Sequence, residues 1–304
     1  MKFLKQAKVF GLKDKVFMSA YGLAEGTLIV TGSSLYDDPF WLKLDRNELR
    51  KGKINILERG NLVDIQNFIN ENDEKEVYIL SNGMITDGHQ LLIMDQANGV
   101  ILNNLEIGEV CIIGPSVTKG YWDEKKNIEE SFIYNKSLNK RYLRTGDMGF
   151  LDNNGDLYIV SRIRDLIMLN NLVYFPQDIE RTSCNAVPEL EADGAAAFTI
   201  THLENEIMVI IQEITRAARK SPQCEKWAKQ IRENVFKVHG VSVAIIVFLP
   251  PGNIPRTTSG KMQRNKAKEK FLNYDWKKEL VSLPSLNSKR LNCNPNSASI
   301  NISY

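Results

Sequence analysis

Long apolar runs are missing from this sequence. Residues 1–17, MKFLKQAKVFGLKDKVF, are interrupted by lysines every few positions, and later apolar runs, such as VAIIVFL at 243–249, are short. A helix that spans a bilayer needs about 20 predominantly apolar residues, and a signal peptide needs an unbroken apolar core. We therefore expect no membrane span and no signal peptide, and a cytoplasmic location.

Paired cysteines and an excess of charge are missing as well. The cysteines are scattered without the paired spacing of a metal site, which favours reduced thiols; they are Cys111, Cys184, Cys224 and Cys293. The formal net charge is +2, too close to zero to indicate a nucleic-acid partner. Basic residues gather only locally, in RTTSGKMQRNKAKEK.

What is present is the composition of an ordinary globular protein of 304 residues, 43% hydrophobic and 25% charged. At about 150 residues per domain, this length favours roughly two domains. Residues 77–162 show short strand patterns such as VYILSNG and EVCIIG, and Asn-Asn-Gly-Asp in GFLDNNGDLYIVS is a favoured hairpin turn. We predict a mainly antiparallel β region here, preceded by a polar surface insertion or subdomain at about 36–76.

The pattern changes past Asp165. PQDIERTSCNAV predicts a helix with Pro176 in its first turn, and AAAFTI and IMVIIQEI predict two strands. A second helix should begin near Ser221-Pro222 and close at Gly240, before the buried strand VSVAIIVFL. With a basic helix after the loop PPGNIPRTTSGK, these elements predict a compact α+β domain.

Four stretches carry a family resemblance. They are YGLAEGTL at 21–28, GEVCIIGPSVTKGYW at 108–122, RYLRTGDMGFLDNNGDLYIVSRIRDLI at 141–167 and IPRTTSGKMQR at 254–264. In this order and spacing they resemble the adenylate-forming superfamily, whose members are AMP-binding and acyl-CoA synthetase-like. Ala24 in YGLAE, the polar stretch at 36–76 and YFPQDIE are similar to the fatty-acyl-AMP ligases in particular.

The resemblance implies a mixed α+β fold in two parts. Residues 1–163 would form the carboxyl-terminal, mainly β part of the large AMP-binding domain, with the insertion at about 36–76. Residues 164–275 would form the small carboxyl-terminal α+β domain beyond a hinge. We predict a disordered tail at 276–304, where Asn and Ser dominate without a period.

The resemblance also implies a reaction. Fatty-acyl-AMP ligases join a fatty acid to ATP, with Mg²⁺, to give an acyl-adenylate and pyrophosphate. The acyl group then passes to an acyl carrier protein, or to a polyketide or nonribosomal synthetase that contains one.

Asp147, in the Thr-Gly-Asp corner, is the residue that the resemblance assigns to the ribose. A carboxylate there can accept both ribose hydroxyls in charge-assisted hydrogen bonds. The alternative is a turn aspartate that caps its own backbone.

Two further assignments lie in YGLAE. The resemblance implies that Tyr21 stacks on adenine, that Gly22 lies against the nucleotide, and that Glu25 holds Mg²⁺ through oxygen, as hard cations prefer. The alternatives are a core aromatic for Tyr21 and a helix-start charge for Glu25.

The remaining assignments are basic. The resemblance implies that Arg162 caps the ribose and that Arg164 marks the hinge; a solvated strand-end charge is the alternative. Lys261 would place its cation where negative charge develops as the fatty carboxylate attacks the α-phosphate. Alternatively, TTSGK is a basic turn before a basic helix.

The sequence also departs from the family. It contains no Gly-rich phosphate loop, and Asn170–Val173 stand where these ligases have Arg-Gly-Arg-Asn, although Asn171 can adopt the left-handed backbone of the absent Gly. We therefore expect the carboxyl-terminal half of a ligase, inactive alone and completed by a separately encoded amino-terminal half. A non-catalytic nucleotide-binding remnant and a carrier-protein docking module are the alternatives.

Overall fold

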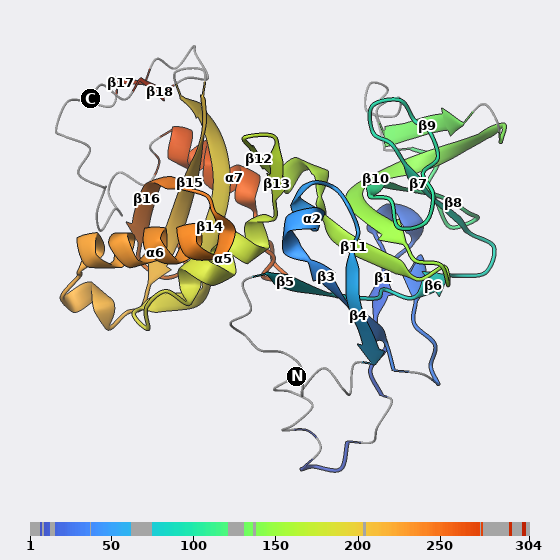
Figure 1. Cartoon of the computed structure of the whole chain (residues 1–304), viewed down its shortest axis with the longest axis horizontal. Coiled ribbons are helices and arrows are strands. Elements are labelled where there is room, and N and C mark those ends of the chain that lie inside the picture. The colour runs from blue at the N-terminus through green and yellow to red at the C-terminus, as the bar shows by residue number, and fades with distance from the viewer. Residues whose placement is uncertain are drawn as a thin grey trace. The chain divides into compact units, whose positions relative to one another are not determined.

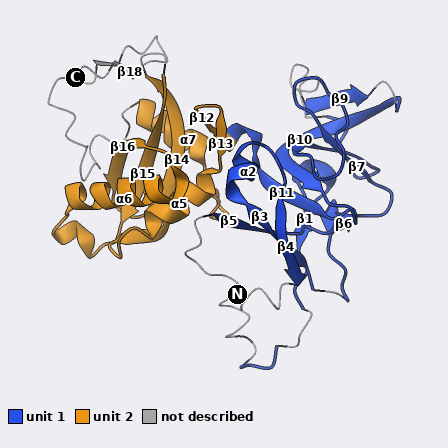
Figure 2. Cartoon of the chain, in the orientation of Figure 1, with its two compact units in different colours: residues 1–164 blue, residues 165–304 orange. Residues whose placement is uncertain are grey.

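The computed structural model describes residues 7, 9–12, 16–36, 38–61, 75–120, 131–135, 138–202, 205–273, 275, 292–293 and 300–301. It divides into two compact units, Met1–Arg164 and Asp165–Tyr304 (Figure 2). The mixed α and β fold expected from the sequence is confirmed (Figure 1). Within the described ranges no helix is both long and apolar enough to cross a bilayer.

The largest sheet of unit 1 is antiparallel, in the order β11-β10-β8-β7, with β9 paired to β10. Its strands are β7 (Gln90–Met94), β8 (Gly108–Ile113), β9 (Phe132–Asn135), β10 (Lys140–Leu151) and β11 (Leu157–Arg162). Alternate residues face opposite sides, as the period of a strand requires. On one side Val110, Ile112 and Leu143 pack in the main core of the unit, and on the other Cys111 packs with Tyr142.

A small sheet in the order β1-β2-β6 holds the YGLAE segment. Its strands are β1 (Ala20–Tyr21), β2 (Thr31–Gly32) and β6 (Met84–Ile85), and the short 3-10 helix η1 (Ala24–Gly26) follows β1. Tyr21 pairs with Thr31 across β1 and β2, and its ring is packed against the main core of unit 1. The YGLAE segment is therefore tied to the same core as the large sheet.

The stretch expected to be an insertion, about 36–76, forms a sheet together with the strand that follows it, in the order β4-β3-β5. Its elements are β3 (Phe40–Asp45), α2 (Arg46–Arg50), β4 (Ile56–Asn61) and β5 (Glu76–Leu80). The Asp45 side chain caps α2 by accepting from the amides of Asn47 and Glu48. Residue 37 and residues 62–74 of this stretch lie outside the described residues.

Unit 2 begins with a hairpin. The 3-10 helix η2 (Ile163–Asp165) crosses the unit boundary, and β12 (Ile167–Leu169) pairs with β13 (Leu172–Tyr174). The two residues between these strands, Asn170 and Asn171, both have left-handed backbones with φ of 52° and 60°. This two-residue turn needs positive φ at both positions, which asparagine tolerates, and the expectation for Asn171 is confirmed.

The body of unit 2 is a three-stranded sheet between helices (Figure 1). The elements are α5 (Pro176–Cys184), β14 (Leu190–His202), β15 (Asn205–Ile214), η3 (Ala218–Lys220), α6 (Cys224–His239), β16 (Val243–Leu249) and α7 (Arg264–Leu272). Strand β15 runs antiparallel to β14 and parallel to β16. The predicted helices and strands are confirmed, although α6 begins at Cys224 instead of at Ser221: η3 ends at Lys220, and the backbones of Ser221 and Gln223 are not helical.

Alternation along the three strands divides the core of unit 2 into two layers. Ala197, Ile210 and Ile246 pack in one cluster with residues of α5 and α6, whereas the neighbouring residues of each strand pack with Ala267 of α7. Most of the expected tail at 276–304 lies outside the described residues. Its described part is the antiparallel pair β17 (Asn292–Cys293) and β18 (Ile300–Asn301).

Candidate functional site

Asp147 lies at a break in the pairing of strand β10. The register between β10 and β8 shifts between Arg144 and Met148, and Gly146 within this break has a positive φ of 71°. Glycine adopts that conformation without the cost that a side chain would impose. The Thr-Gly-Asp corner therefore leaves the ladder to β8, while Asp147 still pairs with Arg162 of β11.

A buried glutamate braces this corner. Glu109 of β8 is 4% exposed. Its Oε2 accepts from Arg144 Nε at 2.8 Å and Nη2 at 2.6 Å, and its Oε1 accepts from the Gly146 amide at 3.2 Å. Thr145 Oγ1 donates to the Val110 carbonyl at 2.8 Å and accepts from the Asp147 amide at 3.1 Å. These hydrogen bonds fix the backbone of the corner at Thr145, Gly146 and Asp147.

These bracing contacts were not predicted from the sequence. The signal for them was present, because Glu109 and Arg144 are charged residues inside apolar strand patterns. A charge in a buried strand requires a partner, but the sequence alone does not say which one.

The Asp147 carboxylate is held by two side chains. It is 6% exposed; Tyr21 Oη donates to its Oδ2 at 2.6 Å, and Arg162 Nε lies 3.2 Å from its Oδ1. The Arg162 side chain itself is 70% exposed. Burial, followed by the nearby Asp147 carboxylate, raises the pKa of Tyr21 well above its usual value, so the phenol keeps the proton that it donates.

Gly22 and Glu25 follow Tyr21 in the chain. A Cβ on Gly22 would lie 1.3 Å from the Leu28 carbonyl oxygen, so this position admits glycine alone. Glu25 is half-buried in η1, and its backbone carbonyl accepts from the Thr118 amide at 2.8 Å. That bond joins the YGLAE segment to the stretch GEVCIIGPSVTKGYW at 108–122. The described residues contain no cluster of three or more acidic, His or Cys side chains that could hold a metal.

Lys261 belongs to unit 2, and it lies on a closed loop. Its amide donates to Thr257 Oγ1 at 3.0 Å, and its carbonyl accepts from the Thr257 amide at 2.8 Å. Gly260 supplies a positive φ of 82° for the turn. The loop thus has a defined backbone, and the Lys261 side chain is exposed.

Buried acids hold both ends of the Lys261 loop. Glu213, 4% exposed, accepts from the amides of Asn253 at 2.6 Å and Ile254 at 2.7 Å. After the loop, Arg264 forms two hydrogen bonds to Glu180, each 2.7 Å long, and another to Asp165 at 2.8 Å. These anchors were not predicted from the sequence; their signal was a charge at the end of the apolar strand IMVIIQEI.

The structure thus brings together some of the predicted residues. Tyr21, Asp147 and Arg162 meet in unit 1, with Gly22 next to Tyr21 along the chain. Arg164 is exposed at the end of unit 1, and Lys261 lies in unit 2.

Known proteins are similar to this chain in sequence and in fold. The family model described as "Disco-interacting protein 2-like, AMP domain" matches residues 164–280. A solved structure from a study of fatty acyl-adenylate ligases from E. coli and L. pneumophila superposes with a TM-score of 0.71 at 28% identity, covering 90% of this chain and 45% of that one. The resemblance to the adenylate-forming superfamily is therefore confirmed.

Curated relatives narrow the resemblance to fatty-acid ligases. The medium-chain-fatty-acid–[acyl-carrier-protein] ligase JamA of Moorena producens is 29% identical, over 89% of this chain and 44% of the relative. TtuA of Teredinibacter turnerae, a ligase with the same description, is 31% identical, over 84% of this chain and 39% of the relative. The chain thus spans less than half the length of the curated relatives it matches.

Proposed function

We propose that this chain carries the ribose-binding and lysine-bearing parts of a ligase that activates a fatty acid with ATP. The product would be an acyl-adenylate, with release of pyrophosphate. One observation supports this most. The buried carboxylate of Asp147, where the pairing of β10 to β8 is interrupted, contacts Tyr21 and Arg162, and the chain is similar to fatty-acid ligases.

The contacts of Asp147 favour a binding role over a capping role. An aspartate that caps its own turn accepts from amides nearby in sequence. Among the contacts of the described residues, the Asp147 carboxylate accepts instead from side chains of Tyr21 and Arg162, which lie on other strands. Each carboxylate oxygen has two lone pairs, so each keeps acceptor capacity for one ribose hydroxyl.

The remaining roles follow the reaction. One oxygen of the fatty carboxylate attacks the α-phosphorus of ATP, the new P–O bond forms, and pyrophosphate leaves with the electron pair of the broken bond. Lys261 would stabilise the negative charge that builds up on the α-phosphate. Glu25 would supply one oxygen to Mg²⁺, which usually takes one or two carboxylates and otherwise phosphate and water oxygens. Tyr21 would stack on adenine.

The partners follow from the names of the relatives. JamA and TtuA are described as ligases that act on medium-chain fatty acids and acyl carrier protein. We propose a fatty acid as the acid and an acyl carrier protein as the acceptor, in the cytoplasm. Because the chain covers 39–44% of these two relatives, the phosphate-binding and acyl-binding segments would come from elsewhere, such as a separately encoded half.

Calorimetric titration of the whole chain with AMP tests the nucleotide site. We expect weak but measurable binding, and at least a 10-fold loss in Asp147→Asn, because a hydrogen bond to a charged group contributes about 1.5–3 kcal/mol. Asp95→Asn is the matched control, since Asp95 caps its own turn by accepting from the amides of Ala97 and Asn98. Equal affinity in wild type and Asp147→Asn would make Asp147 a structural residue.

Pyrophosphate exchange tests catalysis in a fusion of this chain to the amino-terminal part of TtuA. We expect Lys261→Ala to lower turnover about 10²- to 10³-fold with a modest change in KM, the scale of losing one electrostatic contact in the transition state. Lys266→Ala, an exposed lysine of α7, should match the parent fusion. An effect of Lys261→Ala on KM alone would contradict the catalytic role, and AMP binding by an inactive fusion would favour a non-catalytic nucleotide-binding protein.

A further inference from the structure

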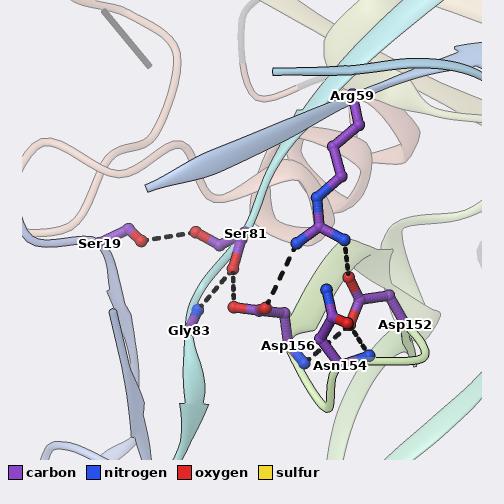
Figure 3. Close-up of polar contacts among 7 residues, drawn as sticks. All are labelled: Ser19, Arg59, Ser81, Gly83, Asp152, Asn154 and Asp156. Atoms are coloured by element: carbon purple, nitrogen blue, oxygen red, sulfur yellow. Dashed lines mark hydrogen bonds and ion pairs between the residues drawn. The ribbon is translucent and has the colours of Figure 1, made fainter. Parts of the chain in front are cut away.

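Arg59 of β4 reaches the turn of the β10–β11 hairpin (Figure 3). Its Nη1 lies 3.0 Å from Asp152 Oδ2, and its Nη2 lies 3.8 Å from Asp156 Oδ2. With its amide oxygen facing the guanidinium, Asn154 accepts from both terminal nitrogens of Arg59 as well. The guanidinium also lies over the Phe40 ring, 4.4 Å from its centroid. The Arg59 side chain therefore contacts three side chains of this turn, those of Asp152, Asn154 and Asp156.

The turn needs this cation. Asp152 is 3% exposed, and its Oδ1 accepts from the amides of Asn154 at 2.9 Å and Asp156 at 3.0 Å. A buried carboxylate without a countercharge is costly. Arg59 supplies that charge from a strand of the β4-β3-β5 sheet.

Ser81 extends the network toward Tyr21. Its Oγ donates to Asp156 Oδ1 at 2.8 Å and accepts from the Gly83 amide at 2.9 Å, while its carbonyl accepts from Ser19 Oγ at 2.6 Å (Figure 3). Ser19 comes two residues before Tyr21. The network thus joins the hairpin turn to the segment that carries the tyrosine.

The paired strands of the hairpin connect its turn to Asp147 and Arg162. From Leu151 paired with Leu157 next to the turn, the strands run to Asp147 paired with Arg162 at the open end, with one register shift between Met148 and Gly149. The outer edge of β11 is paired as well, since the Asn82 amide donates to the Leu157 carbonyl at 2.7 Å. Fixing the turn therefore restricts where the open end can lie.

We infer that Arg59 is a positioning residue for the nucleotide site. From β4 it holds the β10–β11 turn, and through the paired strands it fixes Asp147 and Arg162 opposite Tyr21. The inference rests on the proposed function. It also makes the β4-β3-β5 sheet part of the support for nucleotide binding, so that a change in this sheet alters affinity without touching the ligand.

The test uses the whole chain with Arg59→Gln, which removes the charge, and Arg59→Lys, which keeps it. Arg141→Gln is the matched control, because Arg141 also lies over a ring, 3.9 Å from the Phe132 centroid. We expect Arg59→Gln to weaken AMP binding about 10-fold, the scale of one charged hydrogen bond. Arg59→Lys should recover part of the loss, and Arg141→Gln should bind as wild type.

Amide exchange without nucleotide separates this inference from the proposed function. In Arg59→Gln, exchange at Gly146 and Asp147 should rise, whereas Arg141→Gln should leave it unchanged. Asp156→Asn, a milder change at the turn, should shift exchange in the same direction and serves if Arg59→Gln does not fold. Unchanged exchange at the corner in these variants would overturn the inference, as would loss of AMP binding in Arg59→Lys equal to that in Arg59→Gln. Failure of wild type to bind AMP would overturn the proposed function, and exchange would still decide the role of Arg59.

Discussion

Buried carboxylates near the candidate residues of each unit accept from more than one donor. Glu109 accepts from Arg144 and from the Gly146 amide, and Glu213 accepts from two successive amides before the Lys261 loop. Because an unmatched buried charge is expensive, each of these acids fixes the backbone that supplies its donors. At the residue scale, the acids missed by the sequence analysis stabilise the residues that it predicted.

Cys111 provides a prediction about pH. The thiol is 1% exposed, and burial, with a smaller effect of Glu109, raises its pKa to about 12. Between an unfolded pKa near 9 and this value, the unfolded chain loses the thiol proton while the folded chain retains it. The stabilisation is therefore complete below pH 9 and declines as the pH rises, by about 1.4 kcal/mol per pH unit.

The measurement compares wild type with Cys111→Ala by urea unfolding. Between pH 8.5 and pH 10.5, the free energy of unfolding of wild type should fall by about 2 kcal/mol more than that of the variant. Parallel pH profiles would show that the thiol ionises equally in both states.

At the scale of elements, sequence patterns predicted the hairpin but not what holds it. Asn-Asn-Gly-Asp correctly indicated a turn between two strands, because turn chemistry is local. The Arg59 contact joins residues 93 positions apart, and no local pattern specifies it. The same limit applies to Tyr21 and Asp147, which only the family resemblance assigned to one site.

Gly83 tests how tightly the elements of unit 1 approach one another. Its φ is +77°, and a Cβ there would lie 1.9 Å from the Gly32 backbone carbon of β2; Gly52, with a φ of +76°, has nothing within 4 Å of the same position. Both Gly→Ala changes incur left-handed strain of about 1–2 kcal/mol. Gly83→Ala should cost about 1–3 kcal/mol more, because β2 must move. Equal losses in urea unfolding would contradict the close approach.

At the scale of the whole molecule, the sequence change past Asp165 coincides with the start of unit 2. The helices and strands of this unit were predictable because periodicity marks them clearly: Ala228, Ile231 and Val235 recur every three or four residues on the buried face of α6. The β4-β3-β5 sheet was less predictable, since its charged flanks hid the buried Trp41, Leu42 and Leu44. The average polarity of a segment therefore does not reveal a strand that buries only one of its faces.

The last prediction is that residues 165–275 fold without unit 1. This segment has a sheet with a buried cluster on each side, one against α5 and α6 and one against α7, and a unit with its own core can fold alone. The isolated segment should give a mixed helix and strand circular dichroism spectrum and a cooperative thermal transition.

Ile231→Asp is the control for this prediction, because Ile231 is 0% exposed. An unpaired charge there costs several kcal/mol, a large part of the usual stability of a domain, about 5–15 kcal/mol. That variant should lose the transition. A random-coil spectrum for the unmutated segment would mean that its core is insufficient without the rest of the chain.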